Sequence, residues 1–338
     1  MSSLRFLLGL ALGTTFAAAW QPAKPLDPLS VAQQQLASGR CSEAVPGLTK
    51  MLQGTAKAPL PAYLMLSYCH RELGDPELAV QTLRRGLKAW PASPLPERTL
   101  GELLFRAKYD STEAGQLLEH AARMLPRDPE GKHYYAQWAY LNARHRICAT
   151  QEQQALALPG LSDLALLQMN TLLGMCEGSL ENAASARAAF ERAMAVNAKQ
   201  TAYDPISAMQ YVQFLTRYNE ASRAAEVVEE LLRRVPSFGP AHLEKAKYLD
   251  RAGQPGLAIE EARLALASAG NDLNAERAAH TLLARCFNAA GNAEEAAKEQ
   301  QWIAAHPNPE TPRPQGPACF RLTCTTASVS IDWSGAAW

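Results

Sequence analysis

The sequence has few aromatic residues, no net charge and, after its first 19 residues, no long hydrophobic run. Its 338 residues include 33 lysines and arginines against 33 acidic residues, and only 7% are aromatic. Because β-branched and aromatic residues favour strands, their scarcity argues against a large β-sheet, whereas abundant alanine and leucine favour helices. Zero net charge argues against broad nucleic-acid binding, which needs many cations on one surface. We therefore expect an all-α protein that binds no nucleic acid.

One hydrophobic run lies at the start of the chain. Arg5 precedes an apolar stretch over residues 6–16, and three alanines follow at positions 17–19. A positive residue, a short apolar run and small residues, in this order, are typical of a secretory signal peptide. Residues 1–19 are predicted to be such a signal, removed on export, which leaves a chain without membrane attachment. A retained leader that tethers the protein to a membrane is the alternative.

The sequence also lacks the motifs of common enzymes. It contains no G-x-S-x-G, H-E-x-x-H, Walker or Rossmann glycine pattern. The seven histidines are scattered, and although Glu276 and His280 share a helix face, two ligands do not make a metal site. We therefore expect no catalytic residue, no metal and no cofactor. An enzyme of an unrecognised type remains an open alternative.

What the sequence does contain is a repeated pattern. An apolar-periodic helix is followed by a glycine turn, an alanine-rich second helix and a closing proline or polar residue. The turn glycines are Gly74, Gly253 and Gly291, and glycine supplies the left-handed backbone that ends a helix. The clearest copies span residues 60–93, 239–272 and 277–307.

This pattern resembles the tetratricopeptide repeat (TPR) family, whose helix–turn–helix unit has about 34 residues. In the first clear copy the family signature is carried by Tyr63, Leu66, Ser67, Gly74, Ala79 and Pro91. The resemblance implies an all-α, right-handed solenoid of about eight helix pairs over residues 28–306, with weaker copies between the clear ones. His242 and His280 take the early aromatic position and are predicted to pack. A generic helical bundle that only mimics repeats is the alternative.

In the TPR family, ligand contacts come largely from positions 2, 5, 9, 12 and 13 of the first helix, which face the concave side. Carried over to this sequence, the candidate groove residues are Tyr68, Arg71, Arg98, Arg106, Tyr140, Arg144, Gln213, Arg217, Lys247, Arg251 and Arg285. Four of these arginines, at 106, 144, 217 and 251, are assigned to one repeat position. They either bind the carboxylates of an acidic peptide or complement the dipole at helix C-termini.

The resemblance, together with the leader, implies a function. We expect a non-catalytic scaffold in the bacterial periplasm that holds a peptide or partner protein in its concave groove. Two alternatives remain: a membrane-tethered assembly or biogenesis factor, and a TPR-supported enzyme or glycan-processing accessory.

Seven cysteines in an exported chain invite disulfide pairing. Cys41 and Cys69 are separated by 28 residues, and so are Cys148 and Cys176. In repeat numbering each pair joins the start of one second helix to the next first helix, which predicts two bonds between neighbouring repeats. Buried thiols that only fill core positions are the alternative. Residues 307–338 are expected to form a proline-rich linker and an irregular tail, in which Cys319 and Cys324 could close a hairpin, and Cys286 is left single.

Overall fold

The computed structural model describes residues 27–54 and 57–307, and within them it contains sixteen α-helices and no strand. The predicted all-α class is therefore confirmed. The expected signal peptide at residues 1–19, the tail beyond residue 307 and the Cys319–Cys324 pair lie outside the described residues. The helices are α1 (Pro28–Ala37), α2 (Cys41–Gln53), α3 (Leu60–Glu72), α4 (Pro76–Ala89), α5 (Leu95–Ala107), α6 (Thr112–Met124), α7 (Pro129–Leu141), α8 (His145–Leu156), α9 (Asp163–Ser179), α10 (Ala183–Asn197), α11 (Pro205–Arg217), α12 (Ala221–Arg234), α13 (Gly239–Arg251), α14 (Pro255–Ala267), α15 (Leu273–Ala289) and α16 (Ala293–Ala305).

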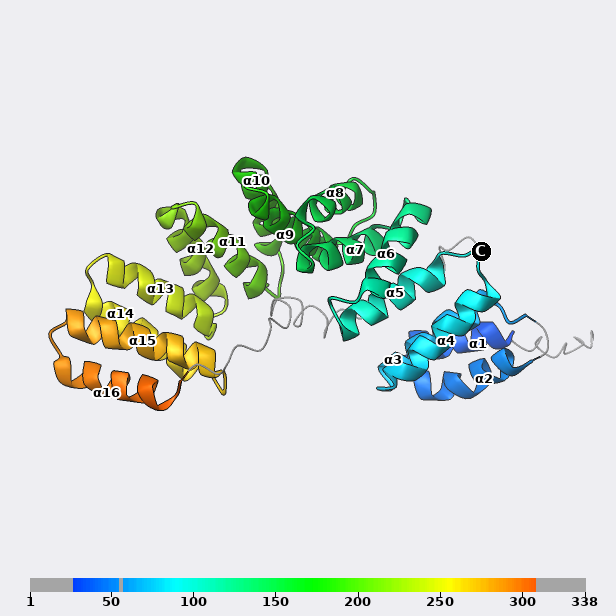
Figure 1. Cartoon of the computed structure of the whole chain (residues 1–338), viewed down its shortest axis with the longest axis horizontal. Coiled ribbons are helices and arrows are strands. Elements are labelled where there is room, and N and C mark those ends of the chain that lie inside the picture. Colours follow the sequence, from blue (N-terminus) through cyan, green and yellow to red (C-terminus); the bar gives the residue numbers. More distant parts are fainter. Residues whose placement is uncertain (1–26, 55–56, 308–338) are drawn as a thin grey trace, which may run out of the picture.

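The described helices form eight successive pairs, each made of an odd-numbered first helix and an even-numbered second helix. Figure 1 shows the pairs following one another along an arch, with α8 and α10 outside α7 and α9. Each pair packs on the next because one pair cannot bury its apolar face alone. This architecture confirms the predicted helical repeat solenoid and its eight pairs.

Small residues occupy the tightest crossings between the two helices of a pair. A Cβ atom placed on Gly101 would lie 2.8 Å from Leu118, and one on Gly174 would lie 2.7 Å from the Phe190 ring. Contacts this short do not occur in packed proteins, so only glycine allows these helices to approach so closely. Larger residues such as Leu118 and Phe190 then fill the space beside the crossing and are wholly buried.

The turn inside most pairs depends on one residue with a positive φ angle. Glycine takes this place in four pairs, at positions 39, 74, 253 and 291. In the three central pairs the same place is held by Ala143, Glu181 and Asn219, with φ angles of 58°, 62° and 59°. The central repeats therefore have the same turn without its glycine, which is why their sequences match the repeat pattern weakly.

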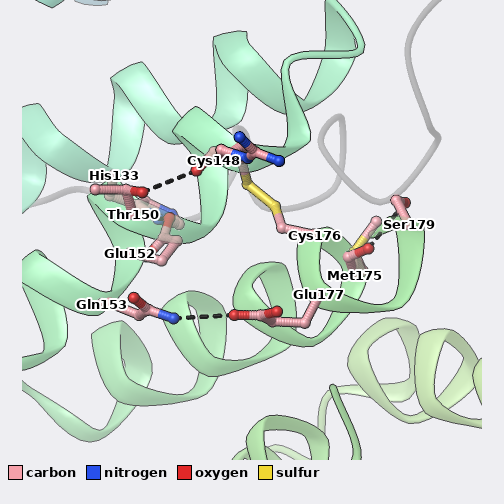
Figure 2. Close-up of a disulfide and its surroundings, with 10 residues drawn as sticks. His133, Cys148, Thr150, Glu152, Gln153, Met175, Cys176, Glu177 and Ser179 are labelled. Carbon is pink, nitrogen blue, oxygen red and sulfur yellow. Dashed lines mark hydrogen bonds and ion pairs between the residues drawn. A yellow bond between two sulfur atoms is a disulfide. The ribbon is translucent and has the colours of Figure 1, made fainter. Parts of the chain in front are cut away.

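One of the predicted disulfides is present. Cys148 in α8 and Cys176 in α9 are bonded, with their Cα atoms 6.1 Å apart, and they tie one helix pair to the next (Figure 2). Cys41 and Cys69 are instead buried free thiols whose side chains are hydrogen-bonded to each other. The predicted Cys41–Cys69 bond is thus absent from the structure. Equal sequence spacing does not give equal surroundings here, since Cys41 is the first residue of α2 whereas Cys148 lies one turn inside α8.

The third described free thiol, Cys286, is also buried. Its sulfur lies 3.6 Å from an Asp250 carboxylate oxygen, and burial, with this carboxylate, raises the pKa of the thiol to about 11.

Among the described helices, none combines the length and the hydrophobicity that a membrane span requires.

Candidate functional site

A small pocket lies where three successive first helices, α7, α9 and α11, come together. Its volume is about 40 Å³, enough for a few water molecules or the end of one side chain. Seven of the ten lining residues are polar in type, but the surface that they and the apolar side chains present to the pocket is mostly apolar. The lining residues are His133, Gln137, Gln168, Thr171, Leu172, Met175, Asp204, Ile206, Ser207 and Gln210.

His133 connects this pocket to a carboxylate in the core. Its Nδ1 lies 2.6 Å from Oε1 of Glu152 in α8, and its Nε2 lies 2.8 Å from the Gln137 amide nitrogen. Glu152 is completely buried, and its second oxygen has no hydrogen-bond partner in the described part of the chain. Burial raises the pKa of Glu152, and the contact with His133 only partly offsets that effect. The histidine is thus held in one orientation at the pocket wall.

The same kind of contact occurs in two other pairs of helices. His242 contacts Glu261 and His280 contacts Glu299, each across 19 residues, the separation that also divides His133 from Glu152. The sequence predicted His242 and His280 only as packing residues, and both also carry this polar contact. The repeated spacing of 19 residues is the sequence signal that would have revealed it.

Asp204 forms the opposite rim of the pocket and begins α11. Its carboxylate accepts hydrogen bonds from the backbone N–H groups of Ile206 and Ser207 and, at 2.5 Å, from the Ser207 hydroxyl. These contacts cap the helix, as an aspartate at this position commonly does. The Asp204 carboxylate, one of the lining groups, is thus held by three hydrogen bonds.

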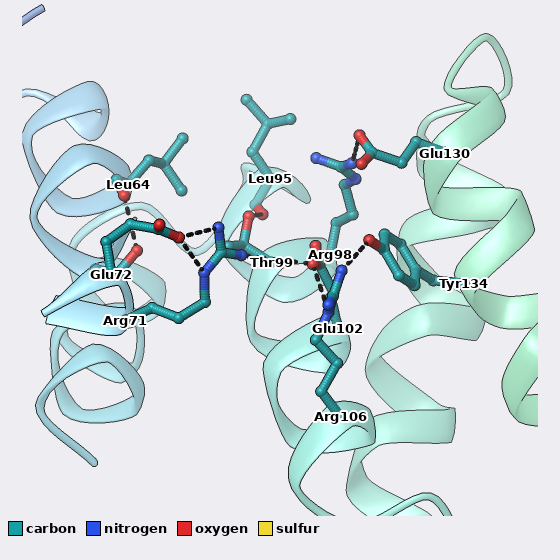
Figure 3. Close-up of polar contacts among 11 residues, drawn as sticks. Leu64, Arg71, Glu72, Leu95, Arg98, Thr99, Glu102, Arg106, Glu130 and Tyr134 are labelled. Atoms are coloured by element: carbon teal, nitrogen blue, oxygen red, sulfur yellow. Dashed lines mark hydrogen bonds and ion pairs between the residues drawn. The ribbon is translucent and has the colours of Figure 1, made fainter. Parts of the chain in front are cut away.

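On the N-terminal side of the pocket, the predicted groove arginines contact other residues of the protein (Figure 3). Arg106 pairs with Glu102 at 3.0 Å and donates to the Tyr134 hydroxyl at 2.6 Å, while Arg71 lies 3.6 Å from Glu102 and stacks near Tyr68. This network joins α3, α5 and α7.

Arg98 also has internal partners. It contacts Asp128 at 3.0 Å and Glu130. Burial alone would lower the pKa of this guanidinium, but the two carboxylates outweigh that effect and raise it. Three of the predicted arginines, at 71, 98 and 106, thus hold neighbouring first helices together.

Arg144 does not share the position of the other recurring arginines. Arg106, Arg217 and Arg251 are the last or next-to-last residues of their first helices, whereas Arg144 lies in the turn and directly precedes α8. Its guanidinium stacks 5.0 Å from the Trp138 ring centre, and the nearby Tyr140 ring contacts His145. The assignment of Arg144 to the repeated position was therefore wrong, because the positive φ at Ala143 ends α7 three residues earlier.

On the C-terminal side of the pocket, two groove cations have partners and two do not. Arg285 lies 2.6 Å from Asp250, and Lys247 lies 2.7 Å from Glu244. Arg217 and Arg251 are exposed and make no ion pair with any described residue, although Arg251 stacks 5.9 Å from the Tyr248 ring centre. Gln213, one turn before Arg217, is also exposed. These two guanidiniums are available to a ligand.

Metal binding has no support in the described residues, where no group of three or more histidine, cysteine or acidic side chains could hold an ion. The inner face offers a small, mostly apolar pocket with amides and hydroxyls beside it, and cations at one end.

The tetratricopeptide repeat family model matches residues 60–92. A tetratricopeptide repeat protein from Parabacteroides merdae superposes with a TM-score of 0.53 at 13% identity, over 77% of this chain and 98% of that one. Residues 60–92 are therefore a tetratricopeptide repeat, and the described array has the fold of tetratricopeptide repeat proteins. A structure described as the functional characterization of Pseudomonas aeruginosa pilF superposes with a TM-score of 0.52 at 17% identity, over 64% of this chain and 95% of that one. A chain of the APC/C hetero-tetramer Cut9–Hcn1 superposes with a TM-score of 0.51 at 17% identity, over 84% of this chain and 53% of that one. No curated protein matches the chain.

The pocket is built from the helix positions that face the groove in TPR arrays. His133 and Gln137 are the fifth and ninth residues of α7, and Thr171 and Met175 correspond to them in α9 once the extra first turn of that helix is discounted. The sequence-based list named none of these four. Applying the same position rule to the weak central repeats would have found them.

Proposed function

We propose that this protein is a non-catalytic scaffold that binds an extended segment of a partner protein along the inner face of its solenoid. TPR repeats generally mediate protein–protein interaction. The observation that carries the proposal is the pocket shared by α7, α9 and α11, because three consecutive repeats contribute the groups that would contact one continuous ligand.

The side chains indicate the chemistry of that segment. The amides of Gln137, Gln168 and Gln210 can each donate to and accept from a peptide backbone. Beyond the pocket, the exposed guanidiniums of Arg217 and Arg251 fit carboxylates, which arginine binds in a forked geometry. The segment is therefore expected to place an apolar side chain in the mostly apolar pocket, its backbone against the glutamine amides, and acidic residues over α11 and α13.

Site-specific photo-cross-linking in the native host tests this proposal. A photoreactive residue in place of Gln168 or Gln210 is expected to give adducts with a partner protein, whereas one in place of Arg233, exposed on the second helix α12, is not. Equal adduct formation from both faces would contradict the proposal.

A charge variant tests the acidic part of the segment. Once a partner is identified, Arg217→Gln/Arg251→Gln should weaken its binding by about tenfold or more, since a hydrogen bond to a charged group contributes roughly 1.5–3 kcal/mol. Arg84→Gln, which removes an exposed arginine on α4, is the matched control and should leave the affinity unchanged. Unchanged affinity in the double variant would exclude these arginines from the site.

We propose further that the protein acts outside the cytoplasm, in the periplasm of a bacterium. The support is the leader pattern of residues 1–19 and the Cys148–Cys176 bond, since disulfides persist in oxidising compartments. Mass spectrometry of the protein from its host should find a chain beginning after Ala19 and a peptide pair joined through Cys148 and Cys176. A chain that retains Met1 and fractionates with membranes would support the membrane-tethered alternative instead.

A further inference from the structure

A second and larger cleft lies between α6, α7 and α8, away from the inner-face pocket. Its volume is about 630 Å³, within the range of small-molecule sites. Three cations line it, one from each helix: Arg123 from α6, Lys132 from α7 and Arg146 from α8. A cationic cleft is unexpected in a chain whose positive and negative residues are equal in number.

Lys132 is the most buried of these cations. It is only 5% exposed, and its ammonium donates to the Gln154 side-chain oxygen at 2.9 Å and to the Ala122 carbonyl at 3.4 Å. Both acceptors are neutral, and no described carboxylate lies within ion-pair distance. Burial lowers the pKa of Lys132, an effect that the more distant Asp128 only partly offsets. The ammonium can donate a third hydrogen bond and lacks a counter-charge.

The two arginines are also without partners. Arg123 and Arg146 are exposed and form no ion pair with any described residue. One carboxylate lines the cleft, that of Glu119, and it is hydrogen-bonded to Tyr135. The lining therefore carries three cations and one anion.

A matched cleft two repeats later has the opposite charge. It lies between α10, α11 and α12, with a volume of about 360 Å³, and Tyr211 in its wall is the seventh residue of α11, as Tyr135 is of α7. Its charged lining residues are one arginine and three carboxylates, namely Arg223, Glu191, Glu226 and Glu230. Since the same architecture gives both clefts, the cations of the first are a property of its side chains and not of the fold.

We propose that the cleft between α6, α7 and α8 binds a phosphate-bearing small molecule. A phosphate monoester carries a charge of about −1.5 to −2 at pH 7, which balances the excess of two positive charges in the lining. The two guanidiniums supply forked donors for its oxygens, and the buried Lys132 supplies a fixed point charge. This site is separate from the inner face, so its failure would leave the proposed partner binding untouched.

Titration calorimetry on the full chain, at constant ionic strength, tests the proposal with inorganic phosphate and phenyl phosphate as probes and acetate as the anion control. Both phosphates are expected to bind, and acetate is not. Tighter binding of phenyl phosphate supports an organic ester as the ligand, and equal binding supports free phosphate. Acetate binding as strong as that of phosphate, or no heat of binding from either phosphate, would overturn the proposal.

Variants then locate the site. Arg123→Gln/Arg146→Gln changes only exposed side chains, so the fold is expected to persist, and phosphate affinity should fall at least tenfold. Arg223→Gln in the matched acidic cleft is the control and should have no effect on phosphate binding. Lys132→Met should also weaken binding, with circular dichroism as the check on folding. Wild-type affinity in the double variant would show that phosphate binds elsewhere and would overturn the assignment.

Discussion

At the scale of single residues, Glu152 and Glu261 have similar histidine partners and opposite pKa shifts. Burial raises the pKa of Glu152, whose second oxygen is unpartnered. Burial acts in the same direction on Glu261, but hydrogen bonds from His242 and from Lys245, 3.0 Å away, outweigh it and lower the pKa below its ordinary 4.5. The weaker burial of Glu261 and its added cation, Lys245, together reverse the sign.

These shifts predict opposite pH dependences of stability. The Glu261 contribution is present above pH 4.5, the ordinary carboxyl pKa, and is lost as the pH falls through the lower folded-state pKa. Glu261→Gln should therefore lower the free energy of unfolding by about 1 kcal/mol at pH 7, and this loss should shrink as the pH falls below 4.5. Because the pKa of Glu152 is raised in the folded protein, its contribution to the free energy of unfolding is complete below pH 4.5. It is lost as the pH rises through the folded-state pKa. As the pH rises, Glu152→Gln should therefore become more stable relative to wild type. Urea denaturation from pH 3 to 8 measures the free energy of unfolding of both variants. Parallel profiles for the two variants would refute the pKa assignment.

The small residues at helix crossings lead to a second prediction at this scale. Gly174→Ala places a methyl group 2.7 Å from Phe190 and should destabilise the protein by about 1–3 kcal/mol, the usual cost of overpacking. Gly47→Ala is the control, since Gly47 lies inside α2 with no atom near its added Cβ, and it should stabilise by about 0.5–1 kcal/mol. Chemical denaturation compares them. Equal midpoints would mean that the α9–α10 crossing relaxes without cost.

At the scale of the elements, the left-handed turn residue explains what could be predicted from the sequence and what could not. Where glycine holds that place, as at Gly74 and Gly253, the helix pair was found and its ends were placed closely. Where Ala143 holds it, nothing in the sequence marks the end of α7, and Arg144 was assigned to the wrong side of the turn. The inner-face pocket was missed for the same reason, since its walls belong to the pairs without a turn glycine. The Cys41–Cys69 bond was predicted from equal spacing and an equal repeat register, but Cys41 begins α2 whereas Cys148 lies one turn inside α8, so the two registers differ.

The same turn predicts reciprocal effects of two substitutions. An L-residue in the left-handed region raises the free energy of the folded state by about 1–2 kcal/mol. Glycine avoids this strain, but it loses more chain entropy on folding, which cancels part of the gain. Ala143→Gly, at φ 58°, should therefore stabilise the protein by about 0.5–1 kcal/mol, and Gly253→Ala, at φ 71°, should destabilise it by about 1 kcal/mol. Thermal denaturation of the two variants measures this. A loss of stability in Ala143→Gly would show that the alanine methyl makes a contact worth more than the strain.

At the scale of the whole molecule, the solenoid has no single core. Its buried residues fall into successive clusters, and each cluster joins a helix pair to the next. The ends of such an array have a neighbour on one side only. Among the described helices, α16 buries Ala296 alone and α1 buries Ala32 and Leu36, whereas ten residues of α9 are buried.

Stability should therefore decline from the centre of the arch towards both described ends. In native-state hydrogen exchange followed by mass spectrometry, amides of α16 and α1 are expected to exchange first, and those of α7 to α11 last, because local opening requires only the contacts that the opening unit makes. The Cys148–Cys176 bond holds α8 to α9 at the centre, so reduction should speed exchange there while leaving α16 unchanged. Protection of α16 equal to that of α9 would mean that the array opens as one unit, or that a segment outside the described residues covers its last helix.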